Sequence, residues 1–280
     1  MGKELSGMQE MAREAGKLMR QGWGRDLRVY QKADQTVVTE VDLAISRLVC
    51  EAVQAEWPGY GLLTEETAAT NTLYLPKGFI VDELDGTFAY VNRRPGSTFQ
   101  CAYYEHDQVL IGLIYDPIRD LMLYAEAGMG VYMQTGAHVS RLEPRTPAPW
   151  SQLRFAHHRT YMTDTYRRVY ASLGVQADNI IPTGSIGSKS LDFALDKVDC
   201  LVSLHRHIGA WDWAPGKVIL EELGYAVSHL AGGALDIRAS AFDQGFGYLV
   251  CPAPYKPRLE QSLSWLTDKL SRRWPAAAVA

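Results

Sequence analysis

The stretch FIVDELDGTFAY, residues 79–90, determines both the expected fold and the expected site. Its first three residues are apolar and predict a buried strand that ends where Asp82 begins. Asp82, Glu83 and Asp85 follow within four residues, and this much negative charge in one place is costly unless cations neutralise it. Carboxylate oxygens are the ligands that Mg²⁺ and similar hard ions prefer in proteins. The stretch therefore predicts a magnesium site at the end of a strand.

The residues after the acids predict a turn and the start of a helix. Gly86 permits a tight turn, and a helix beginning at Thr87 would present free backbone N–H groups and its positive dipole end to an anion. Two other interpretations compete with this one. A D-G-T triplet can be an ordinary turn with solvated acids. The stretch also resembles the D-x-D-G-T nucleophile motif of haloacid-dehalogenase-type phosphatases, but Asp82 and Asp85 are separated by two residues, whereas an in-phase strand pair needs the i, i+2 relation.

Composition excludes several classes of protein. The chain has 280 residues, of which 47% are hydrophobic and 21% charged, as expected of a soluble globular protein with one large or two intimate domains. A net charge of -4 argues against a general nucleic-acid binder. No apolar run approaches the roughly 18 residues that span a bilayer, and the first residues lack a secretory signal, so we expect a cytoplasmic protein without a membrane partner. The four cysteines have no C-x-x-C spacing and are expected to be buried free thiols.

Hydrophobic periodicity predicts a layered α/β (α+β) fold with helices between and around sheets. The expected helices span residues 4–23, 41–57 with Thr39 as N-cap, 163–173, 188–196, 211–223 and 257–272. The expected strands span residues 60–64, 153–156, 179–182 and 200–204, with a meander of three strands over 98–133. The Pro-rich segment 141–149 is the predicted boundary between an N-terminal lobe, 1–145, and a C-terminal lobe, 146–280.

Other acids are placed where they can join the 82–85 cluster. Glu65 and Glu66 follow the strand at 60–64, and strands that neighbour each other in a sheet end side by side, so a second ligand pair is plausible there. Asp42 and Asp212 each lie in the first turn of an expected helix. In that position an aspartate can simply be a helix cap or a carboxylate favoured by the dipole.

Five motifs in order along the chain resemble those of the inositol monophosphatase family, which shares its fold with fructose-1,6-bisphosphatases and 3'-phosphoadenosine-5'-phosphate phosphatases. These motifs are TEVD at 39–42, TEE at 64–66, VDELDGT at 81–87, GSIGSKSLDFAL at 184–195 and WDWAPG at 211–216. The resemblance implies an αβαβα sandwich, a homodimer, and a Mg²⁺-dependent phosphomonoesterase that acts on an inositol or sugar phosphate without a phosphoenzyme. It implies two or three Mg²⁺ held by Glu65, Asp82, Asp85, Asp212 and the backbone carbonyl of Leu84.

The resemblance also assigns roles around these ligands. Thr87, paired with Asp42, would orient the attacking water and deprotonate it together with Glu65. The N–H groups of Gly86 and Thr87 would bind phosphate oxygens. The expected substrate contacts are Asp85, Gly86, Thr87, Gly187, Ser188, Lys189, His205, Arg206 and Asp212. A non-catalytic relative that binds phosphate ligands is the alternative of another class.

Two departures from the family pattern affect the site. Glu83 stands where the family usually has Pro, which removes a rigid residue from the loop of the metal ligands. Counting seven residues back from Asp212 reaches His205, where inositol phosphatases have a Glu that accepts hydrogen bonds from the substrate. With Arg206 and Lys189, this change predicts a wall that binds a second anionic group, so that a bisphosphate such as fructose 1,6-bisphosphate or 3'-phosphoadenosine 5'-phosphate is preferred. The other interpretation is a solvated basic loop.

Overall fold

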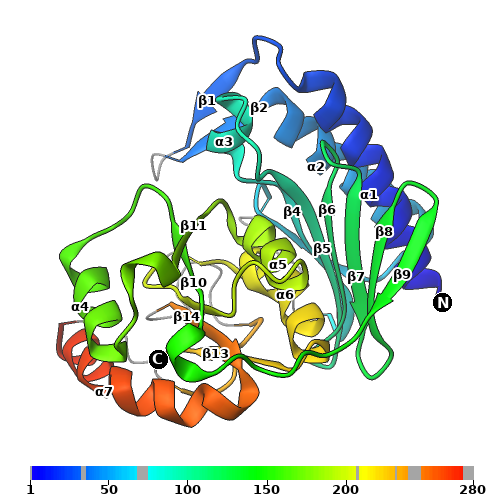
Figure 1. Ribbon diagram of the computed structural model, residues 1–280. Helices are drawn as coiled ribbons and strands as arrows, with labels where there is room; N and C mark the ends of the chain where they lie inside the picture. Colours follow the sequence, from blue (N-terminus) through cyan, green and yellow to red (C-terminus); the bar gives the residue numbers. More distant parts are fainter. Residues whose placement is uncertain are drawn as a thin grey trace.

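The computed structural model describes residues 2–32, 36–67, 75–205, 208–230, 232–238 and 247–273, which form five layers of helices and sheets (Figure 1). The outer layer of one side contains α1 (Lys3–Gly22) and α2 (Glu40–Glu56), which cover a seven-stranded sheet. The middle layer contains α5 (Ile186–Ala194) and α6 (Ala210–Glu222). A five-stranded sheet follows, and α4 (Asp164–Leu173) and α7 (Lys256–Arg273) cover its far face. The predicted αβαβα order is therefore confirmed.

The seven-stranded sheet carries its strands in chain order. These strands are β3 (Gly61–Thr64), β4 (Lys77–Asp85), β5 (Thr98–Glu105), β6 (Gln108–Asp116), β7 (Leu121–Glu126), β8 (Gly130–Thr135) and β9 (His138–Leu142). Only β3 and β4 are parallel, and the others form an antiparallel meander. The three-strand meander is confirmed, and β8 and β9 extend it beyond the predicted end, so that β9 includes the start of the Pro-rich segment.

The five-stranded sheet combines parallel and antiparallel strands in the order β11-β10-β12-β14-β13. The parallel strands are β10 (Phe155–His158), β11 (Ile180–Thr183) and β12 (Cys200–Val202). They fall where the sequence predicts strands, shifted by one or two residues. The antiparallel pair β13 (Tyr225–His229) and β14 (Tyr248–Pro252) was not predicted. The carboxyl ends of β10 and β12 lie at the same edge, which is where parallel sheets carry ligands.

Helix α6 lies between the two sheets and is buried over most of its length, apart from Asp212 in its first turn and Lys217, Glu221 and Glu222 toward its C-terminus. It packs closely on the seven-stranded sheet because Gly112 in β6 has no side chain. A Cβ at that position would lie 2.1 Å from the carbonyl oxygen of Pro215. This close packing fixes the start of α6, and with it Asp212, relative to the strands of the larger sheet.

Strand β4 does not end where Asp82 begins, and this part of the prediction is wrong. The strand continues through the acids to Asp85, and residues 78–85 are all buried. Asp82 pairs with Gln100 and Asp85 with Thr98, so three steps along β4 match two along β5. This irregularity inserts one extra residue, as in a β-bulge, and turns the strand locally. Two side chains at i and i+3, which a regular strand would place on opposite faces, can therefore point to the same side.

The remaining elements are short. The hairpin of β1 (Val29–Gln31) and β2 (Val37–Thr39) was not predicted, whereas the helix beginning at Thr87 is confirmed as α3 (Thr87–Val91). All four cysteines are free, and Cys50 is half-buried rather than buried. Among the described residues, no helix has both the length and the apolar composition needed to cross a bilayer.

Candidate active site

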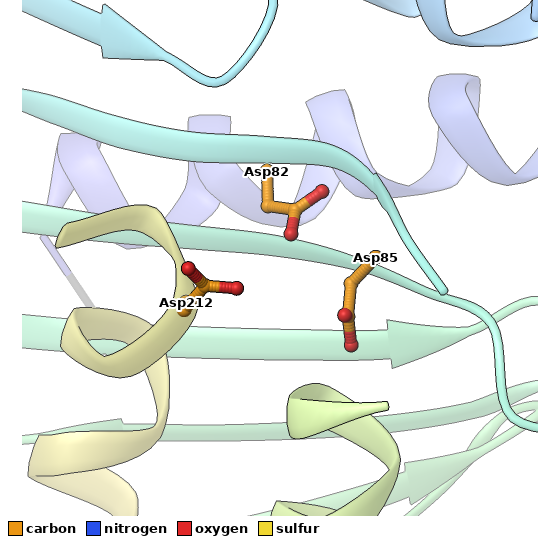
Figure 2. A group of neighbouring side chains, drawn as sticks. All are labelled: Asp82, Asp85 and Asp212. Carbon is orange, nitrogen blue, oxygen red and sulfur yellow. The ribbon is translucent and has the colours of Figure 1, made fainter. Parts of the chain in front are cut away.

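Three aspartates from two elements lie close together near the C-terminal end of strand β4 in the larger sheet (Figure 2). Asp82 and Asp85 come from the bulged end of β4, and Asp212 comes from the first turn of α6. Their carboxylate oxygens lie within 4.8 Å of one another. Asp82 and Asp85 are buried, with 1% and 7% of their surface exposed. The structure therefore brings together three of the four carboxylates that the sequence predicts as metal ligands, and we call them the aspartate triad.

Backbone N–H groups fix each member of the aspartate triad. The Asp85 carboxylate accepts hydrogen bonds from the N–H of Gly187 at 2.7 Å and from the hydroxyl of Thr98 at 3.2 Å. Asp212 accepts one from the N–H of Gly209 at 2.8 Å, which also caps α6. Asp82 accepts one from the N–H of Leu84 at 3.1 Å. These bonds orient the carboxylates before any ligand binds.

The electrostatics of the triad favour cation binding. Burial, together with the nearby carboxylates of Glu65 and of the other triad members, raises the pKa of Asp82 and of Asp212 well above the usual range. Burial also raises the pKa of Asp85, although the N–H of Gly187 opposes the change. A divalent cation would relieve this repulsion. Two oxygens bound to one Mg²⁺ are at most about 4.2 Å apart. The all-oxygen donor set of the triad fits Mg²⁺, and the 4.8 Å within which its oxygens lie is slightly wider than this limit.

Thr87 and Asp42 are in contact next to the triad. The hydroxyl of Thr87 lies 3.2 Å from the Asp42 carboxylate and 3.0 Å from the carbonyl oxygen of Leu84, and it can donate to either. Asp42 is held in turn by the N–H of Thr39 at 2.8 Å, and Thr39 caps α2 as predicted. Burial raises the pKa of Asp42, although the hydrogen bonds from Thr39 oppose the shift. When Thr87 donates to Asp42, its oxygen lone pairs are available to accept a proton from a water molecule.

Glu65, the fourth predicted carboxylate ligand, is in a different environment. Its side chain and that of Glu66 each lie 2.8 Å from the ammonium group of Lys32. Burial opposes the charge of Lys32, but the two glutamates together raise its pKa above the usual range. Burial raises the pKa of Glu66 to about 7, although Lys32 opposes this. Glu65 is close enough to the triad to raise the pKa values of Asp82 and Asp212, but its carboxylate is paired with Lys32.

Glu83 is a buried carboxyl group without a normal hydrogen bond. Its side chain is 1% exposed, and neither of its oxygens has a hydrogen-bond partner among the described residues. Burial raises the pKa of Glu83 to about 8, although the nearby hydroxyls of Thr64 and Ser46 oppose the rise. This residue takes the place of the Pro that the family motif usually has. It therefore adds the cost of a buried, unsatisfied polar group to the strand that carries the aspartate triad.

We expect Glu83→Met to raise the free energy of unfolding by about 1–3 kcal/mol, because an apolar side chain of similar length removes the unsatisfied oxygens. Urea unfolding at pH 7.5 without divalent ions measures the change. Glu83→Gln separates two causes: its amide keeps buried polar atoms but removes the charge that Glu83 gains on unfolding at pH 7.5, so its free energy of unfolding should lie between those of the wild type and Glu83→Met. A Met variant that unfolds more easily than the wild type would contradict this interpretation.

A pocket of about 190 Å³ adjoins the triad and contains several of the predicted substrate contacts. Asp85, Asp212, Lys189 and His205 line it. Lys189 is 6% exposed, and its ammonium group donates to the carbonyl oxygen of Gly184 at 2.7 Å. Of the other predicted contacts, Gly187 lies close to Asp85, and the Ser188 hydroxyl donates to the carbonyl of Ser185 at 3.0 Å. Arg206 lies outside the described residues.

The sequence did not predict two histidines in this pocket. His157 and His158 end β10, and Ser203 follows the neighbouring parallel strand β12. The signal that could have found them is their position, since the carboxyl ends of parallel strands gather at one edge. Burial and the charge of Lys189 lower the pKa of His157 and lower that of His158 to about 4. Both imidazoles are therefore neutral at physiological pH.

Comparison with known proteins identifies relatives that match most of the chain. The sequence model of the inositol monophosphatase family matches residues 3–258. The chain is 26% identical to the inositol-1-monophosphatase of Bacillus subtilis over 226 residues, which cover 79% of this chain and 83% of that protein. It is 28% identical to the 3'(2'),5'-bisphosphate nucleotidase CysQ of Aggregatibacter actinomycetemcomitans over 218 residues, covering 77% and 80%. It is 26% identical to the fructose-1,6-bisphosphatase/inositol-1-monophosphatase of Thermotoga maritima over 243 residues, covering 85% and 87%.

Solved structures show the same fold. The inositol monophosphatase (IMPase) of Thermotoga maritima superimposes with a TM-score of 0.79 at 22% identity, covering 96% of this chain and all of the other. The inositol monophosphatase II of Staphylococcus aureus also superimposes with a TM-score of 0.79, at 19% identity, covering 98% and 99%.

Proposed function

The chain belongs to the inositol monophosphatase family, and we propose that it is a Mg²⁺-dependent phosphatase that hydrolyses an inositol or sugar phosphate with water as the direct nucleophile. The family and the relatives above are phosphatases, so the chain is a hydrolase of phosphate monoesters. The observation that supports the metal dependence is the aspartate triad, in which the buried carboxylates of Asp82 and Asp85 and the partly buried one of Asp212 lie within 4.8 Å of one another. Without cations this much charge would be strongly destabilising.

The aspartate triad would hold two or three Mg²⁺, completed by Glu65 and the carbonyl of Leu84. Mg²⁺ at such a site neutralises charge on the phosphoryl oxygens, lowers the pKa of water and stabilises the leaving oxygen. Lys32 contacts one carboxylate oxygen of Glu65 at 2.8 Å, which leaves the other oxygen for a metal ion. The carbonyl oxygen of Leu84 accepts one hydrogen bond, from Thr87 at 3.0 Å, and has a second lone pair.

The protein would position the water and the phosphate with groups next to the triad. Thr87 would pass its proton to Asp42 and take one from the attacking water, while Glu65 would hold that water in position. Gly86 adopts a left-handed conformation, with φ at 81°, and begins the turn that leads into α3. We assign the N–H groups of Gly86 and Thr87 to the phosphate oxygens, as expected from the sequence.

A second candidate is a bisphosphate phosphatase. It is favoured by the buried ammonium group of Lys189, which lines the pocket next to Asp85 and Asp212. Two of the relatives have names that describe activity on bisphosphates. The contribution expected from Arg206 remains a prediction. Arg206→Ala should weaken kcat/KM for bisphosphates more than for inositol 1-phosphate, and an equal loss for both would indicate a solvated loop.

The test is phosphate release from inositol 1-phosphate, fructose 1,6-bisphosphate and 3'-phosphoadenosine 5'-phosphate, with Mg²⁺ and with EDTA. We expect release that depends on Mg²⁺ from at least one of the three substrates. Release that is unchanged in EDTA would contradict the metal dependence. No release from any member of a wider panel would favour a non-catalytic relative that binds phosphate ligands. We also propose a cytoplasmic homodimer, which sedimentation equilibrium and fractionation of cells would test.

A further inference from the structure

The side chains that line the pocket beside the aspartate triad indicate which substrate it binds. On the premise of the proposed function, we propose that it takes the alcohol part of a phosphorylated hydroxy acid and holds the carboxylate of that acid with Lys189 and His157. The phosphate ester would lie at the triad, and the carboxylate at the nitrogen-bearing side chains. Lys189 and His157 are then specificity-determining residues for the proposed reaction.

Lys189 supplies the positive charge for this carboxylate. The side chain is almost completely buried, and Gly184 accepts a single hydrogen bond from its ammonium group, which has three protons to donate. The negative charges that act on it are Asp85 and Asp212 in the triad and Asp192 on the same helix. Burial lowers the pKa of Lys189 to about 8 although these carboxylates oppose the change, so a carboxylate bound beside Lys189 would favour its ammonium form. A buried ammonium group is costly unless an anion pairs with it.

His157 supplies a neutral hydrogen bond in the same pocket. It is 5% exposed, and its Nδ1 lies 2.9 Å from the hydroxyl of Tyr170. Its Nε2 has no hydrogen-bond partner among the described residues. If the phenol donates to Nδ1, the imidazole carries its proton on Nε2, where it is available to an acceptor. His157 lines the pocket and carries a buried polar atom without a partner among the described residues, and we assign this atom to the carboxylate of the ligand.

Size and charge favour a small carboxylate over a nucleoside or a second phosphate. The pocket measures about 190 Å³, and a cavity of about 150 Å³ holds benzene, with its six carbon atoms. A three-carbon hydroxy acid is close to that size, whereas a nucleoside is far larger. Among the described residues that line the pocket, Lys189 is the one lysine or arginine, and its charge matches that of one carboxylate, while a phosphate carries about -1.5 to -2 at pH 7. Leu201, Val202 and Ile208 supply apolar surface for the carbon chain.

Two monoesters that differ in one group provide the test. In 3-phosphoglycerate a carboxylate replaces one terminal hydroxymethyl group of glycerol 3-phosphate. We expect the wild-type kcat/KM for 3-phosphoglycerate to exceed that for glycerol 3-phosphate by at least about 10-fold, which is the ratio followed in the variants. One hydrogen bond to a charged group provides a preference of this size. Lys189→Met should bring the ratio close to one, and His157→Asn should reduce it severalfold. Lys17→Met is the control, because Lys17 is half-exposed and pairs with Glu14 on α1, away from the pocket, so the ratio for this variant should equal that of the wild type.

The outcomes separate this inference from the proposed function. Hydrolysis of both esters with a wild-type ratio near one, or with a ratio that Lys189→Met leaves unchanged, would overturn the inference while the phosphatase stands. A tenfold preference for fructose 1,6-bisphosphate over 3-phosphoglycerate would overturn the choice of a carboxylate. If neither ester nor any other monoester is hydrolysed, the proposed function fails. Ligand-observed NMR with D-glycerate and Mg²⁺ then tests the pocket alone: binding that Lys189→Met abolishes supports it, and no binding to the wild type overturns it.

Discussion

Asp82→Asn is expected to lower kcat by about 1,000-fold or more while the protein remains folded. Asp82 is the first member of the aspartate triad in sequence, and its carboxylate accepts a hydrogen bond from the N–H of Leu84 in the same strand. Its removal takes a charged ligand from a site that works by neutralising charge. Such sites contribute several kcal/mol of transition-state stabilisation, and each 1.36 kcal/mol corresponds to about tenfold in rate. Phosphate release at saturating Mg²⁺ measures the loss.

Although Asp82→Asn should lose activity, we expect the metal-free variant to be more stable than the wild type. Without metal, Asp82→Asn removes like-charge repulsion and should raise Tm, because burial and the neighbouring acids already raise the pKa of Asp82. Addition of Mg²⁺ should then stabilise the variant much less than the wild type. Asp164→Asn is the control, since Asp164 is an exposed aspartate at the start of α4 and should change neither property. Near wild-type activity of Asp82→Asn would refute the assignment of this residue as a metal ligand.

Thr87→Ala should lower kcat by about 100-fold or more while Mg²⁺ binding changes little, because proton transfer by a positioned group contributes roughly 10²–10⁴-fold. Its hydroxyl lies 3.2 Å from Asp42 and is not part of the aspartate triad. Isothermal titration with Mg²⁺ and steady-state kinetics on the same sample separate the two effects. Thr87→Ser, which keeps the hydroxyl, should recover most of the rate. Equal losses of kcat and of Mg²⁺ affinity would instead place Thr87 among the metal ligands.

The sequence alone predicted the layers of the fold and most of the acidic residues of the site, because those features depend on local patterns. Thr39 and Asp42 form the capping box that opens α2, and Gly174 ends α4 in a left-handed conformation. Such signals lie within a few residues of the element that they start or stop. The apolar residues 79–81 also predicted the buried strand β4, but not its end at Asp85.

Features that depend on pairing between distant segments could not be predicted from local patterns. The bulge that brings Asp82 and Asp85 to one side exists only against β5, so the i, i+3 spacing could not reveal it. The pair of Lys32 with Glu65 joins residues on two different loops at 2.8 Å. The strands β13 and β14 could not be predicted for the same reason, because they form an antiparallel pair whose register no single stretch of sequence specifies.

The substrate pocket shows the same limit. Lys189 and His205 were found because they lie near motifs, whereas His157 and His158 carry no motif and reach the pocket through the parallel pairing of β10 with β12. In sequence these histidines are indistinguishable from ordinary polar residues after a short strand. The specificity of the site is therefore less visible in the sequence than its metal ligands are.

Anomalous diffraction from crystals soaked in Mn²⁺ tests the metal site most directly, because Mn²⁺ takes the same hard oxygen ligands as Mg²⁺. We predict anomalous peaks within coordination distance of Asp82, Asp85 and Asp212, and their disappearance in Asp82→Asn crystals soaked in the same way. Wild-type crystals with no peak at these three aspartates, in a protein that still releases phosphate in the same Mn²⁺ solution, would contradict the metal site proposed here.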